Sequence, residues 1–247
     1  MLRESSSIGN RCFQEKPMLG VIGGMGPLTS AEFIKTIYEL NLTGKKEQNA
    51  PRVILYSDPS FPDRTEAFLK GDNELLLGLL VNALKNLYAY HVSEVVICCI
   101  TSHYLLPDLP SYLRVRVTSL IDIVLSKVIE NKENYLLLCT KGTRKLKIFQ
   151  NNNLWQSAKN YITFLDEHDQ DSIHRMIYQI KGNRYKLEDV VGFLKKMKHK
   201  YRADFLIAGC TEFHILNRDT LLQNNQECPL FLDPLTIIAE KMSSLDF

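Results

Sequence analysis

The chain has 247 residues, 45% of them hydrophobic, and a formal net charge of +2 from 30 basic and 28 acidic residues. A chain of this length forms one large domain or two lobes of about 100 residues each. Because the basic residues form no stripe, the charge gives no reason to expect nucleic-acid binding. No apolar run reaches the roughly 18 residues of a transmembrane helix, so we expect no membrane association.

The cysteines indicate a reducing compartment. Six are present, at positions 12, 98, 99, 139, 210 and 228. They form no C-x-x-C pair and no Cys/His spacing that suits zinc, so no metal site is predicted. A disulfide framework is unusual in a chain this long, so we expect free thiols in the cytoplasm. Residues 1–17 are polar, lack the apolar segment of a signal peptide, and are expected to form a flexible extension.

Short apolar runs alternate with segments of helical spacing along the whole chain. The expected strands are residues 18–22, 53–56, 94–98, 115–117, 135–139, 161–165, 204–208 and 230–232. Helices are expected at about residues 33–40, 66–91, 121–129, 144–152, 169–180 and 186–202, with a closing helix after Asp233-Pro234. This alternation is typical of βαβ units and parallel sheets.

The two halves of the chain repeat one layout, in which strand, polar loop and helix precede a strand that ends in cysteine. We therefore expect an α/β fold of two similar lobes, each a parallel sheet with helices on both faces, and an active cleft between them. The N-terminal lobe is predicted to comprise residues 18–118 and 226–247, with Cys99. The C-terminal lobe is predicted to comprise residues 119–225, with Cys210.

The first expected strand runs into a glycine-rich turn, Gly23–Pro27. Glycine allows positive φ and a close approach of the backbone to a ligand. Thr29 and Glu32 then have the spacing of a capping box, which places a helix N-terminus beside the turn. Such an end attracts anions, so the turn is either an anion site or a tight structural turn. It contains neither a Walker loop nor a complete G-x-G-x-x-G, so the nucleotide prediction is weak.

A second loop, Ser57–Thr65, follows the next expected strand and contains two prolines, which make it rigid. Arg64 on this loop could clamp a carboxylate with two hydrogen bonds. The alternative is a surface arginine that pairs with Asp63.

Cys99 and Cys210 each follow a buried strand and each lie near a threonine. Catalytic groups collect beyond the carboxyl ends of parallel strands. Two opposed thiols suit a proton transfer in which one thiolate takes a proton from one face of a carbon and the other thiol returns one to the opposite face. This chemistry requires no metal or organic cofactor. Single cysteines are usually small buried hydrophobes, and we interpret Cys12, Cys98, Cys139 and Cys228 in that way. Cys98 should face the opposite way from Cys99.

Together these motifs resemble the aspartate/glutamate racemase superfamily, the cofactor-independent two-cysteine racemases, from about Met18 to Asp233 and beyond. The matching segments are Gly23–Pro27 (opening turn), Pro62–Thr65 (substrate-carboxylate loop), Cys99–His103 (family Cys-Asn-Thr-Ala-His), Gly142–Thr143 (Gly-Thr loop) and Gly209–Glu212 (second thiol motif). Glutamate after Cys-Thr is the form of the aspartate racemase branch.

The resemblance implies a PLP-independent isomerase with Rossmann-like lobes. It would be a homodimer that racemises aspartate, glutamate or a related acidic amino acid. Cys99 and Cys210 would be the acid/base thiols, and no cofactor or metal is implied. The implied substrate-binding residues are Met25, Gly26, Arg64, Thr101, Ser102, Thr143, Lys181, Thr211 and Glu212. Arg64 would hold the distal carboxylate, and Thr101, Ser102 and Thr143 would bind the α-carboxylate and the amino end. Met25 and Gly26 would line the cleft. Glu212 and Asp63 would tune or orient these groups, and His103 would have a supporting role.

One departure from the family pattern is Ile100, which replaces the asparagine of the first thiol motif. Isoleucine offers neither a donor nor an acceptor and is stiff. The change is expected to weaken amino-group binding or to alter the substrate. Two alternatives therefore stand beside the racemase: action on a non-standard carboxylate, and binding of a small dicarboxylate without turnover.

Overall fold

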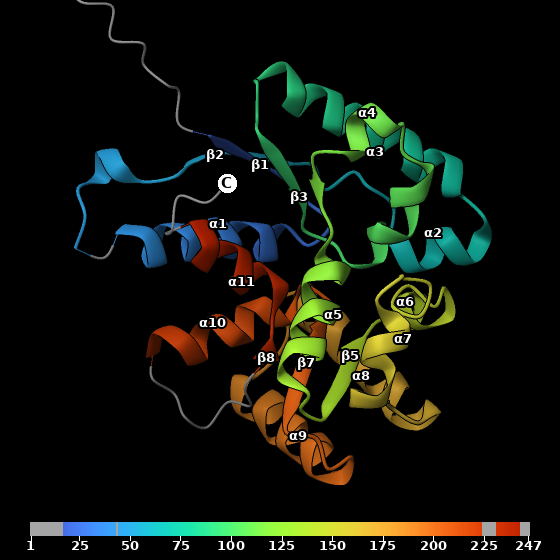
Figure 1. Cartoon of the computed structure of the whole chain (residues 1–247). Helices are drawn as coiled ribbons and strands as arrows, with labels where there is room; N and C mark the ends of the chain where they lie inside the picture. The colour runs from blue at the N-terminus through green and yellow to red at the C-terminus, as the bar shows by residue number, and fades with distance from the viewer. Residues whose placement is uncertain (1–16, 43, 224–230, 243–247) are drawn as a thin grey trace, which may run out of the picture.

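The computed structural model describes residues 17–42, 44–223 and 231–242. In these residues the strands form two four-stranded parallel sheets, in the orders β2-β1-β3-β4 and β6-β5-β7-β8. Figure 1 shows the first sheet in the upper half of the molecule and the second in the lower half. The predicted α/β fold with two parallel sheets is confirmed. Residues 1–16 of the expected extension, and also Cys228, lie outside the described residues.

The two sheets repeat one strand order. The first contains β1 (Met18–Gly23), β2 (Arg52–Ser57), β3 (Glu94–Ile97) and β4 (Val117–Thr118). The second contains β5 (Tyr135–Cys139), β6 (Ile162–Phe164), β7 (Phe205–Gly209) and β8 (Phe231–Leu232). In sheet order β3 corresponds to β7, so the two thiol loops that follow these strands occupy equivalent places.

Helices fill the crossovers between the parallel strands. The α-helices are α1 (Pro27–Leu42), α2 (Arg64–Lys70), α3 (Asn73–Ala89), α4 (Ser111–Arg114), α5 (Leu120–Asn131), α6 (Lys141–Lys145), α7 (Trp155–Ala158), α8 (Glu167–Lys181), α9 (Leu187–Lys200), α10 (Phe213–Gln223) and α11 (Pro234–Lys241). Short 3₁₀ helices are η1 (Glu47–Asn49), η2 (Thr101–Asp108) and η3 (Lys159–Tyr161). In the described part of the chain, every helix is too short or too polar to cross a membrane.

Three apolar clusters form the core, and the alternation of strand residues decides which residue joins which cluster. A central cluster lies between the sheets and combines Val96 and Cys98 of the first with Leu137 of the second, together with residues of α1, α5 and α11. An outer cluster on the first sheet contains Cys99 and the buried face of α3. The third cluster, on the second sheet, contains Cys210. Cys98 and Cys99 thus face opposite ways, as predicted.

The structure corrects the helix expected at residues 66–91. Gly71 has φ 87°, a left-handed conformation that ends α2, and α3 begins at Asn73. The helix expected at residues 144–152 is also wrong. Helix α6 begins earlier, at Lys141, because the Thr140 side chain caps it by accepting a hydrogen bond from the Thr143 N–H. This short helix ends at Lys145.

The expected capping box at Thr29 and Glu32 does not form. Helix α1 already begins at Pro27, a favoured first helical residue because it has no N–H to satisfy. Thr29 therefore lies inside the helix. At the other end of the chain, β8 pairs with β7, so this strand belongs to the second sheet and not to the N-terminal lobe that was predicted to include residues 226–247. Helix α11 packs against both α1 and α5.

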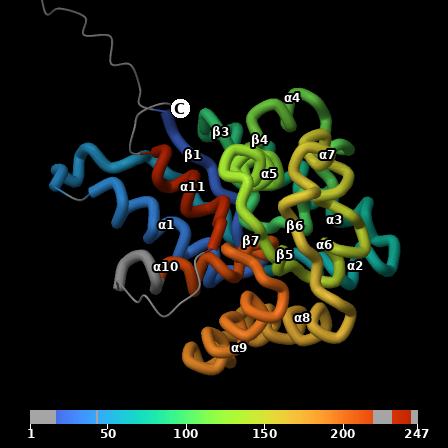
Figure 2. Tube along the Cα trace, turned by 60° about the horizontal axis from the view of Figure 1, so that its bottom comes forward, coloured from blue at the N-terminus to red at the C-terminus, as the bar shows by residue number. Residues whose placement is uncertain are grey.

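A buried histidine–aspartate pair joins α1, α10 and α11, which lie side by side in Figures 1 and 2. His214 Nδ1 lies 2.6 Å from Asp233 Oδ2, and His214 Nε2 lies 3.0 Å from Thr36 Oγ1. The Thr36 hydroxyl also lies 2.9 Å from the Glu32 carbonyl oxygen and donates to it. Burial alone would raise the pKa of Asp233, but His214 and further hydrogen bonds lower it. Asp233 is therefore a carboxylate, and the Nδ1–H of His214 donates to it.

We expect Asp233→Asn to destabilise the fold. The substitution removes the buried carboxylate that accepts a hydrogen bond from His214, and weakening a buried hydrogen bond to a charged group costs about 1–3 kcal/mol of unfolding free energy. Urea unfolding at neutral pH measures the loss. Because the pKa of Asp233 is lowered in the fold, its contribution is present above about pH 4, the ordinary range of the group, and disappears as the pH falls through the lowered pKa. The difference between variant and wild type should therefore shrink in acid.

Lys127→Met is the matched control. It removes an ion pair with Glu130 that is exposed on α5, where the Lys127 side chain is 38% and the Glu130 side chain 63% accessible. An exposed pair of this kind contributes less than about 1 kcal/mol. Equal effects of the two substitutions would show that the His214–Asp233 pair does not hold the three helices together.

Candidate active site

Four strand ends supply the predicted site. The Gly23–Pro27 turn follows β1, Cys99 follows β3, Thr140 follows β5 and Cys210 follows β7. In parallel sheets these carboxyl ends lie at one edge, so loops of the two sheets can meet there. A hydrogen bond joins the two thiol loops: the Thr211 hydroxyl donates to the Cys98 carbonyl oxygen at 3.2 Å.

The first thiol, Cys99, is 7% exposed and lies beside the Arg64 guanidinium. Its carbonyl oxygen is 2.9 Å from His103 Nδ1, while His103 Nε2 accepts from the Leu120 N–H at 3.1 Å. Burial lowers the pKa of His103. Both nitrogens of a neutral His103 are thus engaged with backbone, which fits a supporting role and leaves no free nitrogen for proton transfer.

Arg64 is fixed by backbone oxygens. Its NH1 group donates to the Pro62 carbonyl oxygen at 2.7 Å and to that of Phe61 at 3.3 Å, and NH2 donates to that of Met25 at 2.7 Å. Burial alone would lower the pKa of Arg64, but the neighbouring Cys99 and two carboxylates raise it. Among the described residues, the buried Nε of Arg64 has no hydrogen-bond partner. The guanidinium therefore offers a free donor to a ligand.

The second thiol has an anionic neighbour. Cys210 Sγ lies 2.7 Å from Glu212 Oε2 and donates a hydrogen bond to it. Burial raises the pKa of Cys210 well above its ordinary value, and the charge of Glu212 raises it further, against the opposing effect of Lys181. Glu212 is 1% exposed, and its other oxygen, Oε1, has no hydrogen-bond partner in the described chain. Cys210 is therefore held as a protonated thiol.

Lys181 lies between two carboxylates, with Nζ 3.9 Å from Asp63 Oδ2 and 3.9 Å from Glu212 Oε1. Its ammonium also lies 4.7 Å from the centre of the Tyr178 ring. Burial alone would lower the pKa of Lys181, but Glu212 and Cys210 raise it, so the ammonium stays charged. The Tyr178 hydroxyl donates to Asp63 Oδ2 at 2.7 Å. Helix α8 thereby reaches across to the Arg64 loop.

Three buried threonine hydroxyls form a triangle between the lobes. Thr101 Oγ1 lies 3.0 Å from that of Thr143 and 3.3 Å from that of Thr140, and the last two are 3.1 Å apart. Ser102 beside them donates to the Met25 sulfur at 3.2 Å, a weak acceptor. These hydroxyls can rearrange to bind a carboxylate.

The structure thus brings the predicted site residues together, although their roles stay predictions. Two further residues, Thr140 and Tyr178, were missed. Thr140 had a signal, since it opens a small polar loop after a buried strand. Tyr178 had none, because its stretch of sequence indicates a helix and gives no direction for one side chain.

Ile100 does not line the site. It is 1% exposed and belongs to the central apolar cluster together with Cys98 and Cys139. Its side chain thus packs in the core, and the expectation that Ile100 weakens amino-group binding or alters the substrate stays a prediction.

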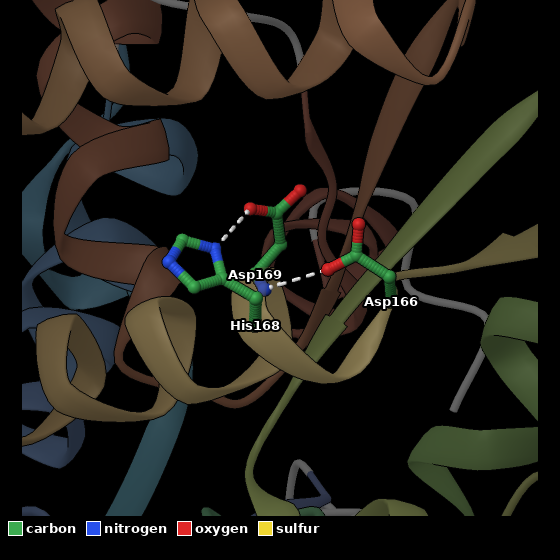
Figure 3. Close-up of side chains that lie close together, drawn as sticks. All are labelled: Asp166, His168 and Asp169. Atoms are coloured by element: carbon green, nitrogen blue, oxygen red, sulfur yellow. Dashed lines mark hydrogen bonds and ion pairs between the residues drawn. The ribbon is translucent and has the colours of Figure 1, made fainter.

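One group of potential metal ligands, Asp166, His168 and Asp169, comes together in the described chain (Figure 3). Lys200 Nζ lies there, 2.8 Å from Asp166 Oδ2 and 2.6 Å from Asp169 Oδ2. Asp166 also caps α8, and its hydrogen bonds with Lys200 and the Asp169 N–H lower its pKa to about 2. These contacts make the group a link between α8 and α9, with a lysine as its cation.

Comparison with known proteins agrees with this geometry. A family model described as Asp/Glu/Hydantoin racemase matches residues 22–242. The fold is similar to Picrophilus torridus aspartate racemase, with TM-score 0.75 and 22% identity over 92% of this chain and 94% of that one. A putative Asp/Glu racemase from Yersinia pestis gives TM-score 0.69 and 22% identity over 92% and 98%. Glutamate racemase from Francisella tularensis, solved with D-glutamate, gives TM-score 0.58 and 18% identity over 93% and 80%. At these identities the structural likeness establishes the fold.

The charges around Cys210 predict opposite effects of two substitutions on its reactivity. Glu212→Gln removes the negative neighbour, so the pKa of Cys210 falls and alkylation by iodoacetamide at a fixed pH becomes several-fold faster, since the thiolate is the nucleophile. Lys181→Met removes the positive neighbour, so the pKa rises and alkylation slows. Mass spectrometry of the Cys210 peptide measures both rates.

Cys98 is the internal control, because it is fully buried and should stay unmodified in all three folded proteins. A change of Cys210 reactivity in the same direction in both variants would mean that access, and not charge, controls this thiol.

Proposed function

The chain belongs to the Asp/Glu/hydantoin racemase family, and on that premise we propose that it is a PLP-independent racemase of aspartate, glutamate or a related acidic amino acid. The observation that carries the proposal is the charge around the two thiols. Cys99 lies beside the Arg64 guanidinium, whereas the Cys210 thiol donates a hydrogen bond to the Glu212 carboxylate. In this proposal Cys99 accepts a proton from the substrate and Cys210 gives one to it.

The proton transfer uses these neighbours. The Cys99 thiolate takes the α-proton, and the positive charge of Arg64 stabilises the developing charges around it. The Cys210 thiol returns a proton to the opposite face of the carbanion and becomes a thiolate. Glu212 accepts a hydrogen bond from Cys210 before the transfer, and Lys181 compensates the negative charge that the transfer leaves there. One proton is lost and one gained, so the product is the mirror image of the substrate.

The unpartnered Nε–H of Arg64 supports an acidic substrate. The Nε–H of Arg64 is free to bind a distal carboxylate, as the family resemblance implies. In this proposal the hydroxyls of Thr101, Ser102 and Thr143 bind the α-carboxylate, as the family resemblance implies. Since Ile100 lies in the core, the structure gives no specific support to the alternative of a non-catalytic binder. A homodimer in the cytoplasm stays the expectation for assembly and location.

Proton NMR in heavy water tests the reaction. With L-aspartate or L-glutamate and no added cofactor, we expect loss of the α-proton signal and appearance of the D-enantiomer on a chiral column. Cys99→Ser and Cys210→Ser should each lower racemisation by about 10²–10⁴-fold, since a serine hydroxyl is a far weaker base than a thiolate.

Cys139→Ala is the matched control, because Cys139 also ends a central strand but lies in the central apolar cluster. It should racemise at close to the wild-type rate. Wild-type racemisation of both enantiomers by Cys210→Ser would rule out the two-thiol scheme. Saturable binding of both amino acids without exchange would leave a binder or another carboxylate as substrate.

A further inference from the structure

Thr29 has an unusual hydroxyl. It is 1% exposed, and Oγ1 has no hydrogen-bond partner among the described residues. Other hydroxyls of α1 bond to their own helix, since Ser30 donates to the Pro27 carbonyl oxygen at 3.0 Å and Thr36 to that of Glu32 at 2.9 Å. A buried polar group without a partner is uncommon and calls for an explanation such as a ligand.

Glu212 Oε1 is a second unpartnered atom in the same place. Its nearest cation, Lys181, is 3.9 Å away, too far for a hydrogen bond. A methyl group added to Gly26 would lie 2.5 Å from Glu212 Oε1 and 3.4 Å from Thr29 Oγ1. The two atoms, one from each half of the chain, therefore lie on the same side of Gly26, where the absence of a side chain makes room for the Glu212 carboxylate.

The missing group must be a hydrogen-bond donor. Glu212 Oε1 is an acceptor, and Cys210 already occupies its partner oxygen Oε2. A threonine hydroxyl accepts through its lone pairs as well as donating. An ammonium carries several protons and can donate to both oxygens, and its positive charge suits the carboxylate. A carboxylate or an alkyl group would leave Glu212 unpaired.

We propose that Gly26, Thr29 and Glu212 form a subsite for the α-ammonium group of the substrate, which selects primary amines over acids that lack one. The proposal rests on the proposed racemase function and deepens it. Thr29 is a specificity residue in this scheme, remote from both thiols in sequence. Gly26 is required because a side chain there would collide with the Glu212 carboxylate and displace it. Arg64 and the hydroxyls of Thr101, Ser102 and Thr143 hold the carboxylates, so a separate set of residues binds the ammonium group.

Calorimetric binding of L-aspartate and succinate to wild type and Thr29→Val tests the subsite, because the two ligands differ by the ammonium group. We expect wild type to prefer aspartate and Thr29→Val to lose about tenfold of this preference, the effect of one hydrogen bond to a charged group. Thr29→Ser should restore it. Thr29→Val should also melt at the wild-type temperature or above, since the valine removes a hydroxyl that bonds to nothing in the unliganded protein.

Ser30→Ala is the control, because it removes the neighbouring hydroxyl that bonds to its own helix, and its aspartate-to-succinate ratio should equal that of wild type. An unchanged ratio in Thr29→Val, with racemisation intact, would overturn the subsite and leave the function standing. A preference for aspartate that Thr29→Val removes, without α-proton exchange in wild type, would sustain the subsite and overturn the racemase. Absence of any preference in wild type would overturn the subsite directly.

Discussion

The buried carboxylate of Glu212 is the interaction on which the site depends. One of its oxygens accepts a hydrogen bond from the Cys210 thiol at 2.7 Å, and the other lies between Lys181 and the turn at Gly26. A buried carboxylate is costly unless neighbouring charges and donors compensate it. Lys181 supplies part of that compensation and is itself shared with Asp63. The balance is incomplete in the free protein, and a ligand with a positive group completes it.

The close approach of the two lobes makes this arrangement possible. The central apolar cluster lies between the sheets and contains residues of both, and the hydrogen bond from Thr211 to the Cys98 carbonyl oxygen holds the thiol loops together. Ile100 belongs to this cluster, which explains how an apolar residue stands in a motif otherwise made of polar ones. The His214–Asp233 pair then holds the first turn of α10, which directly follows Cys210–Glu212, against α1 and α11. Apolar packing and the His214–Asp233 pair therefore both hold the site in place at the junction of the lobes.

The positions of the strands along the chain and their ends could be predicted from the sequence, because buried parallel strands are short apolar runs with polar loops after them. The thiols were found in this way, and so was the break into small polar residues at Thr140. The order of the strands within each sheet was not predicted. The ends of the helices were harder to predict. Gly71 lies within a long stretch of helical spacing, so the break there was not predicted. Thr29 and Glu32 have the spacing of a capping box, but the helix already begins at Pro27. Contacts across the lobes, such as Tyr178 with Asp63, depend on tertiary packing of residues 115 positions apart and leave no trace in a single sequence.

The surroundings of the two thiols are unequal, whereas racemisation interconverts mirror images of equal free energy. In the proposed reaction a turnover leaves Cys99 protonated and Cys210 as a thiolate, the reverse of the resting arrangement. Arg64 opposes protonation of Cys99 and Glu212 opposes the Cys210 thiolate, so the free protein must return a proton to Cys210 before it repeats the same direction. The negative charge of Glu212 favours that return, whereas the charged Lys181 stabilises the Cys210 thiolate until it occurs. The asymmetry therefore affects the resting state and the rate in each direction, while the equilibrium between enantiomers stays fixed by symmetry.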